Sequence, residues 1–118
     1  MKKINFILML LLLVPQIVYP HAYLMETQPE EGAVLSKPPQ IVTLQFLGTL
    51  EHVFFGIEVF DKEGAKISSK PLLKDTEDGS VIEAELTGEL ESGEYTVKWH
   101  GMSKDGHRQK GTFLFTIK

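Results

Sequence analysis

The sequence predicts an all-β fold, in which seven short antiparallel strands form a sandwich. Ten glycines and six prolines are spread over 118 residues, so turn signals recur at short intervals. Apolar and polar residues alternate in several runs, which is the two-residue period of a half-buried strand. No stretch after residue 20 shows the 3.6-residue period of an amphipathic helix. Together these observations exclude a helical bundle and favour a sandwich.

Each expected strand has its own local signal. Val42, Leu44 and Phe46 alternate with polar residues, and Tyr95, Val97 and Trp99 do so again near the C-terminus. The Asp-Gly pair after Lys104 is a strong hairpin signal, so it is expected to join the last two strands. Residues 71–79 are polar and begin with proline, and they are interpreted as a loop. The seven expected strands are residues 21–27, 41–47, 52–60, 65–69, 81–86, 94–103 and 113–117.

The run from Leu90 to Tyr95 resembles the tyrosine corner of antiparallel sandwiches, in which a tyrosine bonds back to nearby backbone. Trp99 lies on the same side of its strand and is expected in the core. Strand number, turn spacing and this corner indicate a Greek-key sandwich of the Ig-like or cupredoxin-like kind.

Composition excludes several classes of function. Twelve Lys and Arg residues stand against 16 Asp and Glu, for a formal charge of −4. No basic tract is present, so we expect no nucleic-acid partner. The absence of cysteine excludes a disulfide scaffold, a thiolate metal site, a cysteine nucleophile and a lipoprotein anchor.

Residues 1–20 are interpreted as a secretory signal, and residues 21–118 as one domain. Two lysines precede a short apolar run that Pro15 and Pro20 interrupt, and the run is too short to span a bilayer. An uncleaved anchor is the alternative, and a cut after Ala22 is another, because the residues before His21 are not the usual small ones. Cleavage before His21 leaves 98 residues and, without two lysines, a charge of −6. We expect this domain in the periplasm.

Strand parity predicts which loops lie together. If every strand reverses direction, the start of the first strand shares one end of the sandwich with residues 48–51, 71–79 and 104–108. The residues expected on this common rim are His21, Glu51, His52, Asp105 and His107.

These residues include a possible metal-binding set. An N-terminal His21 offers its α-amine and its ring Nδ1 to one metal and closes a six-membered chelate ring. Asp105 and His107 flank Gly106 and can point the same way. An amine, two imidazoles and a carboxylate suit tetragonal Cu(II). Zn(II) uses the same donor types but prefers a tetrahedron.

The chain resembles the CopC family of secreted copper-binding proteins. The resemblance covers residues 21–118 and is densest towards the C-terminus. It is carried by the following segments: His21-Ala22-Tyr23-Leu24, residues 29–33 and 42–46, Gly93 to Trp99, Ser103-Lys104-Asp105-Gly106-His107, and Gly111-Thr112-Phe113.

The resemblance implies that His21, Asp105 and His107 bind Cu(II). Family members often carry a glutamate two residues after the phenylalanine of the second strand, and this chain has Gly48 there. Glu51, His52 or water is the alternative fourth donor. Only Met25 and Met102 follow the signal, so no methionine-rich Cu(I) site is expected.

The expected function is extracytoplasmic Cu(II) binding in copper homeostasis and resistance, as a carrier or buffer that needs no catalytic group. The resemblance implies an inner-membrane copper transporter as a partner. An Ig-like interaction module without a metal is one alternative. A His-brace copper enzyme is the other, although 98 residues leave little room for an extended substrate surface.

Overall fold

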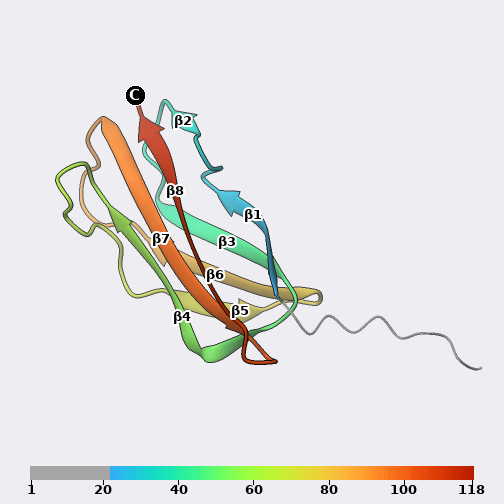
Figure 1. Cartoon of the computed structure of the whole chain (residues 1–118). Coiled ribbons are helices and arrows are strands. Elements are labelled where there is room, and N and C mark those ends of the chain that lie inside the picture. Colours follow the sequence, from blue (N-terminus) through green and yellow to red (C-terminus); the bar gives the residue numbers. More distant parts are fainter. Residues whose placement is uncertain (1–21) are drawn as a thin grey trace, which may run out of the picture.

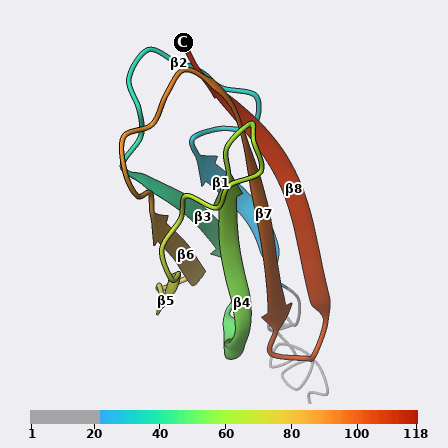
Figure 2. The same cartoon turned by 90° about the vertical axis from the view of Figure 1, so that its left-hand side faces the viewer.

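Two four-stranded sheets pack face to face in the computed structural model, which describes residues 22–118 (Figures 1 and 2). The predicted signal and His21 lie outside the described residues. Residues 22–118 contain no helix that could cross a membrane. The strands are β1 (Tyr23–Gln28), β2 (Val34–Leu35), β3 (Ile41–Leu47), β4 (Leu50–Phe60), β5 (Leu72–Asp75), β6 (Gly79–Glu85), β7 (Gly93–Ser103) and β8 (Arg108–Ile117).

The strand order is β1-β3-β6-β5 in one sheet and β2-β8-β7-β4 in the other. We call them the β3–β6 sheet and the β7–β8 sheet. All pairs of strands are antiparallel except β2 and β8, which are parallel. The predicted all-β sandwich is confirmed, with eight strands in place of seven.

The core lies between the sheets and is built from the alternating residues. Val42, Leu44 and Phe46 of β3 are buried, as are the inward residues of β7 and β8. The Trp99 ring meets the Phe46 ring edge-on, with 5.4 Å between centroids. Trp99 is therefore a core residue, as predicted.

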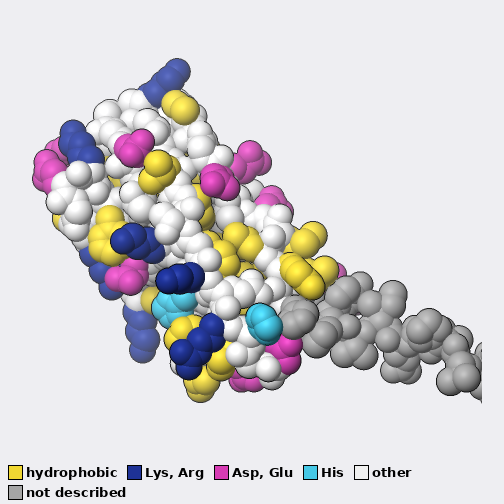
Figure 3. Space-filling view, in the orientation of Figure 1, with side chains coloured by type: hydrophobic (Ala, Val, Ile, Leu, Met, Phe, Trp, Pro, Cys, Tyr) yellow, Lys and Arg dark blue, Asp and Glu magenta, His cyan; other side chains and the backbone are white. Residues whose placement is uncertain are grey.

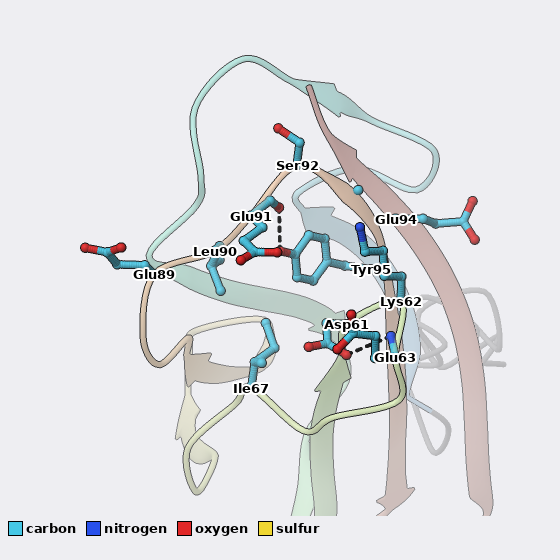
Figure 4. A pocket seen from close by; sticks show the side chains of 11 residues that line it. Asp61, Lys62, Glu63, Ile67, Glu89, Leu90, Glu91, Ser92, Glu94 and Tyr95 are labelled. Atoms are coloured by element: carbon cyan, nitrogen blue, oxygen red, sulfur yellow. Dashed lines mark hydrogen bonds between the residues drawn. The ribbon is translucent and has the colours of Figure 1, made fainter.

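The tyrosine corner is present at the end of the sandwich where β7 begins (Figure 4). The Tyr95 hydroxyl donates to the Glu91 carbonyl oxygen at 2.6 Å, and its ring stacks on Phe115. Burial raises the pKa of Tyr95, and the nearby negative charges of Asp61 and Glu91 act in the same direction. The corner closes the loop before β7, as the sequence indicated.

Two segments differ from the predicted strands. The predicted strand at residues 65–69 is wrong: Ile67 N donates to Val59 O in one sheet, and Ser69 N donates to Glu85 O in the other. This segment crosses between the sheets and therefore pairs continuously with neither. The predicted loop at 71–79 contains β5 instead, because Pro71 stands just before an edge strand, where proline costs no ladder hydrogen bond.

The strand β2 was not predicted. It has two residues, Val34 and Leu35, which pair with Thr116 and Ile117 at the end of β8. Two residues are too few to show a period of two, so no sequence pattern reveals this strand.

Candidate metal centre

One end of the sandwich gathers the predicted rim residues. Gly48 N donates to Asp78 O at 2.8 Å, which joins the β3–β4 and β5–β6 turns. Lys104 Nζ lies 3.6 Å from Glu51 Oε2, which joins the β7–β8 turn to β4. We call this end the rim. The contacts confirm the parity prediction for residues 48–51 and 104–108 and for the turn after Asp75, whereas residues 72–74 of the third predicted loop run away from the rim as part of β5.

Asp105 and His107 stand in the turn between β7 and β8, at the bottom of Figure 1. Gly106 N donates to Ser103 O, and Ser103 N donates to His107 O, both at 2.9 Å. Gly106 has φ of +86°, a conformation that glycine adopts without steric cost. This tight turn explains why the Asp-Gly-His spacing occurs here.

A buried serine orients the Asp105 carboxylate. Ser103 is fully buried, and its hydroxyl donates to Asp105 Oδ1. His107 N also donates to Asp105 Oδ1, at 3.3 Å. The side chains of Asp105 and His107 are exposed to solvent. The Ser103 hydroxyl and the His107 N–H thus fix the orientation of the carboxylate.

The described chain begins beside the same turn. Ala22 is fully buried, and its carbonyl oxygen accepts a hydrogen bond from the Gln109 side chain. Gln109 is the second residue of β8 and follows His107, the last residue of the β7–β8 turn, by two residues. The backbone carbonyl next to His21 is therefore anchored close to His107.

Gly48 has a backbone role of its own. Its φ is +88°, and it bridges to Gly79 across the β5–β6 turn. A glutamate at this position would place a β-carbon in the left-handed region, which costs about 1–2 kcal/mol. The departure from the family pattern is consistent with the local geometry.

The two alternative donors both have other partners. Glu51 pairs with Lys104, as described above. His52 Nε2 lies 3.0 Å and 3.1 Å from the two carboxylate oxygens of Asp75, at the end of β5. Neither residue joins Asp105 and His107: no group of three or more His, Asp or Glu among residues 22–118 is arranged to hold a metal ion.

Asp75, Ser80 and Gln109 belong to the rim but were not predicted. The Ser80 hydroxyl donates to Asp75 Oδ1 at 3.0 Å and accepts the Leu50 N–H at 2.9 Å. The hydrogen bond from His52 lowers the pKa of Asp75, and that from Ser80 lowers it further, while partial desolvation opposes both. Counting strand reversals placed residues 71–79 at this end of the sandwich, and no other feature of the sequence pointed to Asp75.

The opposite end carries an acidic pocket beside the tyrosine corner (Figure 4). Asp61 Oδ1 accepts the backbone N–H groups of Glu63 and Ala65, each at 2.9 Å, so this carboxylate serves the turn after β4. Glu89 and Glu91, on the loop before β7, are exposed to solvent. The pocket offers no metal-binding group among the described residues.

Known proteins share this fold and sequence. The CopC domain matches residues 24–118. Protein YobA of Escherichia coli K12 is 33% identical over 106 residues, which cover 90% of this chain and 86% of that protein. Copper transport protein CutJ of Bacillus subtilis is 25% identical over 111 residues. This match covers 94% of the present chain but only 20% of CutJ.

Solved structures agree with the family match. The crystal structure of CopC from Methylosinus trichosporium OB3b superposes with a TM-score of 0.72 at 26% identity, covering 83% of this chain and 94% of that one. PcoC, a methionine rich copper resistance protein from Escherichia coli, has a TM-score of 0.66 at 23% identity, covering 83% and 99%, and so supports the fold. The eight-stranded sandwich, its Asp-Gly-His turn and the domain match lead to one conclusion: this chain belongs to the CopC family, and its function is related to copper.

Proposed function

We propose that the protein binds one Cu(II) ion in the periplasm and acts as a carrier or buffer in copper homeostasis and resistance. The observation that carries the proposal is the hydrogen bond from Gln109 to the Ala22 carbonyl. It anchors the residue after His21 beside the turn that bears Asp105 and His107. Three residues from the two ends of the domain can then serve one ion.

The donor chemistry fits Cu(II). Cleavage before His21 frees an α-amine, and because the pKa of an α-amine is ordinarily below that of a lysine amine, a metal deprotonates it more readily. This amine and the His21 ring would chelate the ion, and the His107 imidazole and Asp105 carboxylate would complete an N,O set. Water is the simplest further donor, because Glu51 and His52 already have partners.

The comparisons support copper as the bound metal, and the side chains of this chain support Cu(II) as its oxidation state. CutJ is named as a copper transport protein, and PcoC is described as methionine rich. In this chain only Met25 and Met102 follow residue 20, on β1 and β7 respectively. Two thioethers on different sheets do not form a soft Cu(I) site, so hard and borderline donors remain.

The proposed partner is an inner-membrane copper transporter, and no catalytic step is assigned to the protein. A carrier needs a ligand set that opens to solvent, and both Asp105 and His107 are exposed. Such a site allows copper to pass to a second protein without unfolding the domain.

A titration of single variants with Cu(II) tests this proposal. His21→Ala and His107→Ala should each weaken Cu(II) binding by orders of magnitude, because each removes an imidazole from the ion. His100→Ala is the matched control, since its ring packs at 4.8 Å from the Phe54 ring on the outer face of the β7–β8 sheet. Binding should also weaken in acid, where protons compete for the amine and imidazoles.

Electron paramagnetic resonance reports the ligands in the same samples. The proposal expects a tetragonal, nitrogen-rich Cu(II) spectrum that changes in His107→Ala and stays the same in His100→Ala. Equal loss of binding in both variants, or no binding by the processed protein, would contradict it.

A further inference from the structure

The outer face of the β7–β8 sheet carries three cationic side chains and a histidine in an otherwise acidic domain. Lys98 and His100 lie on β7, and Arg108 and Lys110 lie on β8. Figure 3 shows Lys and Arg side chains gathered around a histidine over this sheet. We call these four residues the basic face. After removal of residues 1–20, the chain has 10 Lys and Arg against 16 Asp and Glu, so the cluster opposes the net charge.

Aromatic rings hold the basic face in place. The Arg108 guanidinium lies 5.0 Å from the centroid of the Phe54 ring, and the His100 ring packs on the same phenylalanine. Lys98 Nζ lies 5.5 Å from the centroid of Phe60. These contacts restrict long side chains before any partner arrives, which reduces the entropy lost on binding.

One carboxylate, that of Glu58, lies among these cations and forms its ion pair with another residue. Lys98, Arg108 and Lys110 form no ion pair within 4 Å in the described residues 22–118. Glu58, the cross-strand neighbour of Lys98, is instead 3.7 Å from Lys66. Three positive charges are thus available to a negatively charged partner.

The spacing of the cations fits an extended chain. Arg108 and Lys110 alternate on β8, so their side chains leave the same face about 7 Å apart. Lys110 stands opposite His100 in the ladder, and a shallow depression is lined by Lys98, His100 and Lys110 together with one carboxylate, that of Glu58. Alternate side chains of an extended peptide have the same spacing of about 7 Å.

We propose that the basic face docks an acidic segment of another protein, in extended conformation, with carboxylates at every second residue. Charge complementarity carries the assignment. Cations lie over the two phenylalanine rings, but Val53, next to Phe54 in the chain, is 85% exposed and Leu114 on β8 is 38% exposed, so a membrane surface is the competing partner that the vesicle measurement below tests. A second copy fits less well: β6 offers Glu83 and Glu85, but Lys74 Nζ already lies 3.0 Å from Glu83.

The position of this face would matter for copper transfer. Arg108 follows His107 directly in the chain, so a segment docked on β8 lies next to the rim. The docking itself requires no metal, however. A negative result for copper binding would leave this inference standing, and the reverse is also true.

The experiment is a nuclear magnetic resonance titration of the metal-free protein at low ionic strength. The probe is a peptide of four alternating Glu-Thr pairs with blocked ends, and a peptide with four Glu followed by four Thr is its control. The alternating peptide should shift the amide signals of β7 and β8 around the basic face, and it should bind several-fold tighter than the block peptide.

Two triple variants isolate the face from overall charge. K98Q/R108Q/K110Q should weaken binding about tenfold, because three exposed ion pairs of modest strength are lost together. K37Q/K70Q/K118Q removes the same charge from exposed positions elsewhere and should change the affinity less than twofold.

Four results would overturn the inference. Equal effects of the two triple variants would mean that only net charge matters, and equal binding of the two peptides would refute the spacing. Binding to phosphatidylglycerol vesicles but not to the peptide would indicate a lipid surface. Concentration-dependent self-association that K98Q/R108Q/K110Q abolishes would indicate a second copy.

Discussion

The rim depends on Ser80, and Ser80→Ala tests this dependence. Ser80 and Leu50 are buried, with 0% and 1% of their surface exposed. The Ser80 hydroxyl is the acceptor for the Leu50 N–H, and it is also a donor to Asp75, which holds His52. Removing one oxygen therefore leaves a buried backbone donor without a partner and frees one side of the Asp75 carboxylate.

The expected loss follows from the burial of that donor. An orphaned buried N–H costs about 1–3 kcal/mol, whereas an exposed N–H would regain a hydrogen bond to water. For a domain of roughly 100 residues, each kcal/mol lowers Tm by about 4–8 °C. Ser80→Ala should therefore lower the unfolding free energy by about 1–3 kcal/mol.

Urea unfolding of the metal-free protein measures this change, with fluorescence of the single tryptophan, Trp99, as the probe. The slope of the unfolding free energy against urea concentration should stay constant, because the substitution does not change the surface area exposed on unfolding. Ser36→Ala, at an exposed position, is the matched control and should change stability by less than about 0.5 kcal/mol. A loss in Ser80→Ala as small as that of the control would refute the role of this hydroxyl in holding the rim.

Three further changes have defined outcomes. Because the pKa of Asp75 is lowered in the folded state, its carboxylate stabilises the fold above the unfolded pKa near 3.8, and this contribution is lost as the pH falls through the lower folded value. Asp75→Asn should therefore be less stable than the parent at pH 6, and the difference should shrink in acid. Urea midpoints at a series of pH values measure this difference. Tyr95→Phe removes the hydrogen bond to Glu91 O and should cost about 0.5–1.5 kcal/mol in chemical unfolding, with the Phe115 stacking retained. Gly48→Glu should cost about 1–2 kcal/mol in the same assay because φ is positive there, and an unchanged stability would show that the turn relaxes.

The sequence predicted those parts of the fold whose signals are local and repeated. Strand β3 was found because Val42, Leu44 and Phe46 repeat the inward position three times. Strand β5 was missed because it is short and follows Pro71, which is typical of a loop in an isolated sequence. A strand at a sheet edge pairs with only one neighbouring strand. The sequence of that neighbour does not reveal where the edge strand lies.

The residues of the candidate site also fall into those that a local sequence signal predicted and those that it did not. Asp105 and His107 were predicted because a turn motif brings them together within three residues. The partners of His52 and Ala22 were not, because Asp75 and Gln109 are 23 and 87 residues away and no local pattern encodes such side-chain contacts. Counting strand reversals recovered which loops share an end, but not which atoms meet there.

The most direct test of the copper proposal is the intact mass of the secreted, processed protein under native conditions after exposure to a cupric salt. The proposal predicts one species, a 98-residue chain that starts at His21 and carries a single copper ion. A chain that starts at another residue, or a chain of the right length without copper, would contradict the proposed ligand set.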